Sequence, residues 1–197
     1  DGATHQGIFD IAFLKNIPNL VLMAPRDAVE LEAMLEFAIG LDRPVGLRYP
    51  RAVIPQTLYP VGPLEIGKAE VLREGKDFAL VALGSMVLPA LGAIDLLEKE
   101  GLKGALVNAR FVKPLDVNLF KAIAAQTKII VSIEEGIIEG GFGSALTEAI
   151  DKPVIRIGLP AEFIPHGLRD ILLENYGLTA KKIADKILRT IKLSTSI

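Results

Sequence analysis

Cysteine is absent from the 197-residue sequence, and histidine occurs only twice. The lack of cysteine excludes disulfide scaffolds and cysteine–metal sites, and it gives no support to an extracellular setting. Catalytic pairs of cysteine and histidine are excluded for the same reason. Each of the two histidines, His5 and His166, is therefore a candidate to be weighed individually.

An excess of charge of one sign and long apolar runs are also missing. Charged residues make up 23% of the chain and the formal net charge is -2, which gives no electrostatic reason to expect nucleic acid or an anionic membrane as a partner. No apolar run reaches the ~18 residues that a membrane span needs, and the start does not resemble a signal peptide. Apolar residues make up 50% of the chain, which is enough to bury a core. We therefore expect a soluble, intracellular protein located in the cytoplasm.

Strand-like apolar runs alternate with helical periodicity along most of the chain. The runs predict strands at 20–24, 45–49, 78–83, 105–107, 129–133 and 154–157. The helices between them are predicted from apolar periodicity and from capping residues, at 9–15, 27–39, 85–97, from 116 onward, 145–150, 168–174 and 180–192. This alternation is typical of an α/β fold with a doubly wound, mostly parallel sheet.

Three of these helices have a predicted N-cap. Asp27 caps the first of them, with Glu30 as its capping-box partner, while Ser85 and Asp116 cap two later helices. The stripe predicted to face the core of the helix after Asp27 consists of Leu31, Met34, Leu35 and Ala38. Between the first two α/β stretches, residues 52–66 contain three prolines and a glycine, which predict an interdomain linker.

The chain opens on Asp1-Gly2-Ala3-Thr4-His5-Gln6-Gly7. Small and polar neighbours allow a ligand to approach His5 closely, and an imidazole can accept or donate a proton near pH 7. A structural loop histidine is the alternative. Because the sequence begins inside such a loop without a methionine, we expect it to be part of a larger enzyme.

Two arginines, Arg48 and Arg51, follow one another at the C-terminal end of a predicted strand. Ligands of open α/β sheets bind at that edge, and a guanidinium can hold a phosphate through two hydrogen bonds. The alternative is a pair of surface arginines in ion pairs.

Glu134-Glu135-Gly136 precedes the glycine-rich stretch 140–144, between a predicted strand and a helix. A phosphate cradle at the helix N-terminus is one interpretation. We prefer a tight strand-to-helix turn at a subunit contact, because the spacing of phosphate-binding motifs is absent and two glutamates would repel a phosphate. His166, which follows Ile164-Pro165, is interpreted as a structural or interface residue.

Seven segments occur in a fixed order along the chain: Asp1–Gly7, Ile17–Asn19, Met23–Pro25, Arg48–Arg51, Arg110–Asp116, Glu134–Gly136 with Gly140–Ser144, and Ile157–Pro160 with Phe163–Gly167. In this order they resemble the C-terminal third of the 1-deoxy-D-xylulose-5-phosphate synthase family, over essentially the whole chain. Transketolases and the pyruvate dehydrogenase beta chain carry similar Lys-Pro-Leu-Asp and Glu-Glu-Gly pieces. The Arg-Tyr-Pro-Arg and Phe-Ile-Pro-His-Gly pieces favour the synthase.

The resemblance implies a division of the chain and a reaction. Residues 1–55 correspond to the end of a pyrimidine-binding domain, 56–66 to a linker and 67–197 to a complete transketolase C-terminal domain. The family joins pyruvate and D-glyceraldehyde 3-phosphate with loss of CO2, for isoprenoid, thiamine and pyridoxal synthesis. Thiamine diphosphate with Mg2+ supplies the carbanion chemistry. The family resemblance also implies a homodimer, and we expect neither nucleic acid nor a membrane as partner.

The resemblance also assigns roles to three residues. His5 corresponds to a catalytic histidine that donates or relays a proton at a substrate carbonyl. Asp1 corresponds to an acidic residue that orders the substrate pocket, and Arg51 to the arginine that holds the phosphate of the acceptor. The sequence departs from the family at Ala52, where glycine is common, which affects the turn that carries Arg51.

Other family features have no counterpart in these 197 residues. These are the diphosphate–magnesium segment, the glutamate that activates the cofactor, and the aromatic residue that packs on its ring. We therefore expect no cofactor bound to this polypeptide and no synthase activity from it alone. The alternatives are the same part of another thiamine-diphosphate enzyme, such as a transketolase-like split subunit or an oxo-acid dehydrogenase beta chain, and a non-catalytic dimerisation module.

Overall fold

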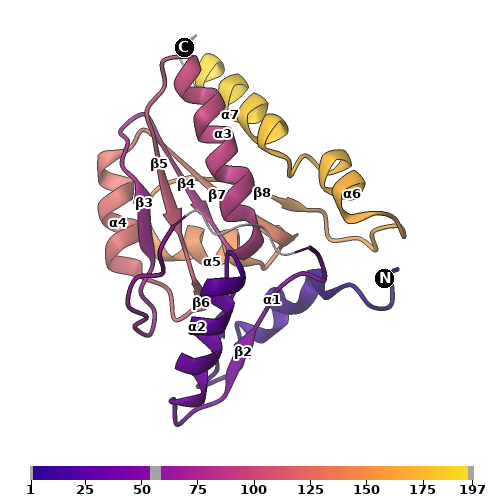
Figure 1. The fold of residues 1–197 in the computed structure, drawn as a ribbon. Helices are drawn as coiled ribbons and strands as arrows, with labels where there is room; N and C mark the ends of the chain where they lie inside the picture. The colour runs from indigo at the N-terminus through magenta and orange to yellow at the C-terminus, as the bar shows by residue number, and fades with distance from the viewer. Residues whose placement is uncertain (1, 54–58, 195–197) are drawn as a thin grey trace.

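The structure is a computed structural model that describes residues 2–53 and 59–194. Figure 1 shows a large sheet covered by helices on both faces and a smaller sheet beside it, which carries α2. The strands are β1 (Val21–Met23), β2 (Val45–Leu47), β3 (Glu70–Arg73), β4 (Phe78–Ala82), β5 (Gly104–Asn108), β6 (Phe111–Lys113), β7 (Ile129–Ile137) and β8 (Val154–Leu159). The α-helices are α1 (Asp10–Leu14), α2 (Ala28–Ile39), α3 (Val87–Lys99), α4 (Val117–Gln126), α5 (Phe142–Ala149), α6 (Arg169–Asn175) and α7 (Ala180–Ser194). Two 3₁₀ turns, η1 (Gly7–Phe9) and η2 (Gly84–Met86), precede α1 and α3.

The large sheet has five strands in the order β3-β5-β4-β7-β8. The four strands β5, β4, β7 and β8 pair in parallel, and β3 joins the edge antiparallel to β5. The predicted α/β fold with a mostly parallel sheet is therefore confirmed. The edge strand β3 was not predicted, because its four residues include two charged ones and form no apolar run.

Both faces of the large sheet are buried, which explains the continuous apolar runs. In β4, Phe78 and Leu80 pack into one core cluster with α3 and α7, whereas Val81 packs into another with α4 and α5. The apolar face predicted for α3 (Val87, Ala90, Leu91, Ile94 and Leu97) is buried throughout, as expected. In Figure 1, α3 and α7 lie side by side along the front of the sheet.

The small sheet joins the beginning of the chain to its middle. Its strand order is β2-β1-β6, with β1 parallel to β2 and antiparallel to β6. β6 was not predicted as a strand, because a three-residue element carries no periodicity. It brings Phe111 into a small core with Met23 and Met34.

The predicted stripe on α2 is wrong at one position. Met34 is fully buried, but the next stripe residue, Leu35, is 52% exposed. The small sheet has only three short strands, and the described part of the chain covers only one side of α2.

The predicted caps are partly confirmed. Asp27 accepts a hydrogen bond from the Glu30 amide (2.9 Å), and Asp116 accepts one from the Leu119 amide (3.2 Å), as N-caps do. Glu30 does not close a capping box on Asp27, because its carboxylate accepts from the Arg26 amide instead (2.8 Å). Ser85 does not cap α3, since it lies inside η2 and points elsewhere.

No helix in residues 2–53 and 59–194 is long and apolar enough to cross a membrane. Part of the predicted linker, residues 54–58, lies outside the described residues.

Candidate active site

The loop that carries His5 forms a tight turn on the surface. The His5 amide donates to the Gly2 carbonyl (3.1 Å), and the Thr4 hydroxyl lies 2.9 Å from His5 Nδ1. Gly2 has a φ of 81°, in the left-handed region that glycine adopts without strain. His5 is exposed and accessible to a ligand. Asp1, the predicted neighbour in substrate binding, lies outside the described residues.

Contacts on both sides hold this loop against the large sheet. The Gln6 side chain donates to the Ile164 carbonyl (2.7 Å) and accepts from the Ile164 amide (3.2 Å). On the other side, the Gly7 carbonyl accepts from Arg48 through Nε (3.3 Å) and Nη2 (3.2 Å). The rings of Phe9 and Phe163 meet edge to face with centroids 5.6 Å apart. The segment that precedes His166 therefore packs beside the His5 loop, although the two lie near opposite ends of the sequence.

A cavity of about 330 Å³ opens beside the loop. The two predicted site residues that the structure describes, His5 and Arg51, both line it. Arg48, Glu135 and Arg169 line the same cavity. With Asp10, its wall combines an imidazole, three guanidinium groups and two carboxylates, a set that suits a small phosphorylated molecule with a polar reacting centre. The roles predicted for His5 and Arg51 stay predictions.

Arg48 is tied into the protein by backbone acceptors. Besides the Gly7 carbonyl, its Nη2 donates to the Glu135 carbonyl at 2.5 Å. Burial lowers the pKa of Arg48 from its ordinary value, and the nearby charges of Glu135, Asp10 and Glu134 act in the opposite direction. Both arginines line the cavity, but Arg48 is half-buried and bound to backbone carbonyls, whereas Arg51 is exposed.

Glu135 connects three parts of the chain. Its carboxylate accepts from Arg169 Nε (2.7 Å) and Nη2 (2.5 Å) and from the Ser85 hydroxyl (2.6 Å). Burial lowers the pKa of Arg169, but the hydrogen bonds and the charge of Glu135 outweigh it, so the pKa lies above its ordinary value. Arg169 was missed by the sequence reasoning, because Glu135 is distant in the sequence and no motif joins the two.

The other glutamate of the pair serves the following turn. Glu134 is fully buried, and its carboxylate accepts from the amides of Phe142 and Gly143 (both 2.8 Å) at the start of α5. Burial raises the pKa of Glu134, while these two hydrogen bonds lower it less. A side chain at Gly141 would collide with the Glu134 carboxylate and the Ile137 carbonyl. A carboxylate of the chain itself therefore occupies the helix N-terminus, which confirms the tight turn and leaves no phosphate cradle there.

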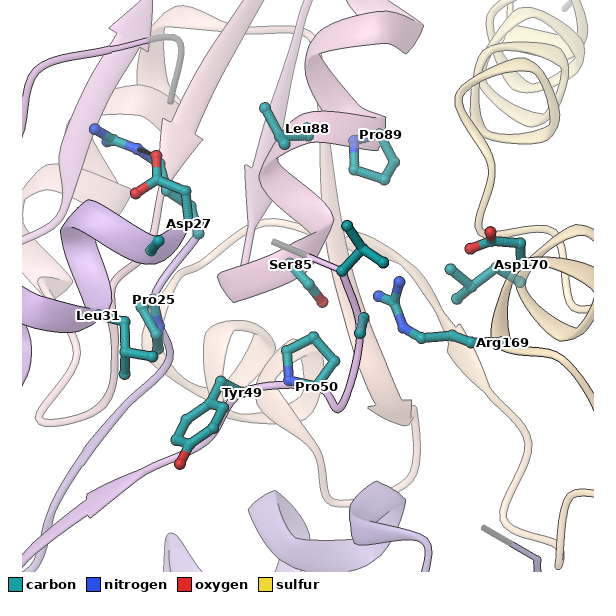
Figure 2. Close-up of a pocket in the computed structure, with 15 residues that line it drawn as sticks. Pro25, Asp27, Leu31, Tyr49, Pro50, Ser85, Leu88, Pro89, Arg169 and Asp170 are labelled. Atoms are coloured by element: carbon teal, nitrogen blue, oxygen red, sulfur yellow. Dashed lines mark hydrogen bonds and ion pairs between the residues drawn. The ribbon is translucent and has the colours of Figure 1, made fainter. Parts of the chain in front are cut away.

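Figure 2 shows a neighbouring cavity of about 280 Å³ with a largely apolar wall. Leu31, Leu88 and Pro89 line it, and the guanidinium of Arg169 points toward Ser85 and Pro50 in this view. Four residues line both this cavity and the one beside His5: Tyr49, Pro50, Arg169 and Leu173. The segment before Arg51 and the side chain of Arg169 therefore lie where the two cavities adjoin.

A second charged cluster lies between the two sheets. Arg26 donates to Glu70 (2.5 Å), and Arg110 donates to Glu30 (2.8 Å) and lies 2.9 Å from Glu70. The side chains of Arg26, Glu30 and Arg110 are at most 3% exposed. Asn108 completes the cluster by donating to Glu30 (2.8 Å). These contacts hold α2, β3 and the end of β5 together. Arg26 also lines the cavity of about 280 Å³, but no member of the cluster lines the cavity beside His5.

Metal ligands are not gathered in the described part of the chain. Within residues 2–53 and 59–194, no group of three or more histidine, aspartate or glutamate side chains could hold a metal ion.

Comparisons with known proteins agree with the fold. Residues 67–183 match the family described as transketolase, C-terminal domain, and residues 1–56 match the transketolase pyrimidine binding domain. Because the first match alone covers more than half of the chain, the protein belongs to the transketolase family.

Among curated relatives, the chain is similar to 1-deoxy-D-xylulose-5-phosphate synthases, which confirms the predicted resemblance. It is 48% identical to the enzyme of Heliobacterium modesticaldum over 191 residues, covering 93% of this chain and 30% of the relative. It is 47% identical to the enzyme of a Cyanothece species over 197 residues, covering 95% of this chain and 31% of the relative. The chain thus spans about a third of the length of the curated relatives it matches.

Two solved structures illustrate the fold. A protein described as "Split gene transketolase, inactive beta4 tetramer" superposes with a TM-score of 0.91 at 35% identity, covering 98% of this chain and 64% of its own. A transketolase from Campylobacter jejuni superposes with a TM-score of 0.78 at 24% identity, covering 96% of this chain and 29% of its own, and it supports the fold alone.

Proposed function

We propose that this chain is part of a 1-deoxy-D-xylulose-5-phosphate synthase. The enzyme would join pyruvate to D-glyceraldehyde 3-phosphate with loss of CO2, and its product would serve isoprenoid, thiamine and pyridoxal synthesis. The similarity to relatives of that name over nearly the whole chain carries the proposal. The cavity lined by both His5 and Arg51 supports it, since this reaction needs a proton donor and a side chain that binds the acceptor's phosphate in the same cavity.

Each of the three predicted residues has a proposed task. His5 donates or relays a proton at a substrate carbonyl oxygen, and its exposed position in the loop leaves room for a substrate. Arg51 binds the phosphate of the acceptor through charge-assisted hydrogen bonds. Asp1 orders the pocket from the first position of the same loop.

The cofactor belongs to the full-length enzyme in this proposal. Thiamine diphosphate with Mg2+ supplies the carbanion chemistry when bound. The described residues do not fit that group, since they gather no metal ligands and the N-terminus of α5 is occupied by Glu134. We derive no catalytic step through the cofactor from this chain.

It follows that the 197-residue polypeptide alone is expected to be inactive. The similar split-gene transketolase is described as an inactive β4 tetramer, which supports this expectation. We further propose that the full-length enzyme is a cytoplasmic homodimer, and that the chain divides at residues 56–66 into the end of a pyrimidine-binding domain and a transketolase C-terminal domain.

One alternative is favoured by a specific observation. The high structural similarity to the split-gene transketolase supports a transketolase-like split subunit, which would act with a separate chain. An oxo-acid dehydrogenase beta chain and a non-catalytic dimerisation module, both compatible with parts of the sequence, have no comparable support. The acceptor substrate distinguishes the synthase from an oxo-acid dehydrogenase, because the dehydrogenase binds no sugar phosphate.

A chimera tests the proposal directly. The matching 191 residues of the Heliobacterium modesticaldum synthase are replaced by this chain, and 1-deoxy-D-xylulose 5-phosphate is measured from pyruvate and D-glyceraldehyde 3-phosphate. We expect product from the chimera and none from the 197-residue chain supplied with the same substrates, thiamine diphosphate and Mg2+. A soluble chimera that makes only transketolase products would replace the proposal with the alternative, and turnover by the isolated chain would contradict the expected inactivity.

Two substitutions in the chimera test the site. His5→Ala is expected to lower kcat by about 10²- to 10⁴-fold, the usual contribution of a general acid or base. Arg51→Met is expected to raise KM for D-glyceraldehyde 3-phosphate by about 10- to 100-fold and to leave KM for pyruvate within about twofold, since a charge-assisted hydrogen bond contributes about 1.5–3 kcal/mol. Arg43→Met, at an exposed arginine before β2, is the matched control and should change neither.

A further inference from the structure

Two pairs of hydrogen bonds hold the backbone immediately after His5. Gln6 contacts the amide and the carbonyl of Ile164, and the Gly7 carbonyl accepts two hydrogen bonds from Arg48. The partners come from opposite sides, one from the segment after β8 and one from the end of β2. The turn closed by the His5 amide on Gly2 comes immediately before these two attachments in the sequence.

Arg48 is built to hold backbone. Its Nε and Nη2 bind the Gly7 carbonyl, and Nη2 also binds the Glu135 carbonyl, so one guanidinium joins the loop to the end of β7. Burial lowers the pKa of Arg48 most, the negative charges of Glu135, Asp10 and Glu134 favour its charged form, and the like charge of Arg169 disfavours it. Both of its acceptors are peptide carbonyls, which position a guanidinium but undergo no chemistry.

Gln6 makes the second attachment through an amide that both donates and accepts. This pairing with the Ile164 peptide fixes the orientation of the Gln6 side chain, because a rotation of the amide would break both hydrogen bonds. The edge-to-face contact of Phe9 and Phe163 supports the same docking a few residues further on. The loop itself contains two glycines, so it has much backbone freedom to lose.

We infer that Arg48 and Gln6 are positioning residues that clamp the His5 loop from both sides and so fix the imidazole over the cavity. The catalytic importance of this clamp rests on the function proposed for His5; its existence does not. A displacement of about 1 Å at a reacting group can cost about 10²-fold in rate, which is why a flexible loop needs such attachments. On this assignment Arg48 contacts no substrate, and the phosphate is bound by Arg51.

The two histidines make the inference measurable in the 197-residue chain. After labelling with ¹⁵N-histidine, NMR records the ring nitrogens of His5 and His166 and the exchange of the His5 amide with solvent. Arg48→Met and Gln6→Leu are each expected to shift the His5 ring signals and to speed exchange of the His5 amide by about five- to tenfold, the effect of losing one net hydrogen bond of about 1 kcal/mol. Gln6→Glu keeps the acceptor for the Ile164 amide and should restore part of the protection.

Arg169→Met is the matched control. It removes the same charge from the same cavity by the same substitution, but its target is Glu135 and not the loop. We expect the His5 signals to change little in this variant. If Arg169→Met alters His5 as much as Arg48→Met does, or if neither Arg48→Met nor Gln6→Leu alters it, the clamp is refuted.

Folding is checked on the same samples by thermal unfolding and by the dispersion of the amide spectrum. If Arg48→Met fails to fold, the comparison of Gln6→Leu with Gln6→Glu still tests the clamp, because the Gln6 side chain lies in a surface loop. Failure of the chimera to make product would contradict the proposed function but would not affect the NMR result. The two outcomes are therefore distinguishable.

Discussion

One arginine–glutamate cluster lies between the two sheets, and another borders the His5 cavity. In the first, Arg26, Glu30 and Arg110 are almost completely buried and bind one another. In the second, the Arg169 side chain is 30% exposed and the Glu135 side chain 14% exposed, at the wall of a cavity. The same two side-chain types thus serve once to join elements and once to shape a site open to solvent.

Their surroundings explain the difference. Arg26, Glu30 and Arg110 are shielded from solvent, whereas Glu70 is 19% exposed. Breaking one contact among the three buried side chains leaves a buried charge unmatched. At the cavity, solvent can replace a lost partner. The comparison teaches that the two clusters differ in what lies beside them. His5 and Arg51 line one cavity together with Glu135 and Arg169, and no side chain of the first cluster lines that cavity.

The largest effect on stability is expected from Glu30→Gln. Glu30 accepts from Arg110 and Asn108 with no exposed surface, so the substitution should lower the free energy of unfolding by about 3–5 kcal/mol. Urea unfolding measures it, and Glu36→Gln, at an exposed position on the same helix, should cost less than about 0.5 kcal/mol. Equal losses for the two variants would contradict the stabilising role assigned to the buried contacts of Glu30.

A smaller loss is expected from Glu135→Gln at the cavity. The side chain binds Arg169 and Ser85, but solvent can reach the pair, so we expect a loss of about 1–2 kcal/mol in the free energy of unfolding. Ser85→Ala and the double variant complete a thermodynamic cycle, in which the shared hydrogen bond should give a coupling of at least about 0.5 kcal/mol. Additive effects would mean that Ser85 and Glu135 do not act together.

The smallest effect is expected at a surface pair outside both clusters. Asp77 accepts from the Lys103 amide (2.9 Å) and from Lys128 (3.2 Å), and these contacts lower its pKa below the ordinary value. A lowered carboxyl pKa stabilises the fold above the pKa of the unfolded chain, about 3.9, and this contribution is lost as the pH falls through the folded value.

Asp77→Asn should therefore cost about 0.2–1 kcal/mol at pH 7, as exposed pairs do, and the difference from the wild type should shrink below about pH 4. Urea unfolding at the two pH values measures it, with Asp42→Asn on the exposed loop before β2 as the control at pH 7. If the difference in the free energy of unfolding between Asp77→Asn and the wild type grew on acidification, the pKa of Asp77 would not be lowered by folding.

Local patterns determined most of the secondary structure. The all-apolar run of β4 requires cover on both faces, and the spacing of the apolar residues on α3 permits one buried face. Asp116 caps α4 through a contact three residues away, so the sequence alone contains that interaction. The opening loop was identified from its own residues and from a family resemblance, and the resemblance to the synthase was confirmed over nearly the whole chain.

Only the tertiary structure decided which side chains meet. Arg48 reaches the Glu135 carbonyl across 87 positions and Arg110 reaches Glu30 across 80, distances over which no periodicity or cap carries information. Glu30 was predicted as a capping-box residue, but its carboxylate accepts from the Arg26 amide four residues away and from Arg110 Nε across 80 positions. Only the second of these contacts is beyond the reach of local patterns. Short strands such as β6 also depend on a distant partner, because three residues gain their hydrogen bonds and burial only when β1 lies beside them. The sequence thus determined most of the elements and the chemistry available to the His5 cavity. Long-range packing decided that both arginines line this cavity and that Arg48 is bound to the loop backbone there.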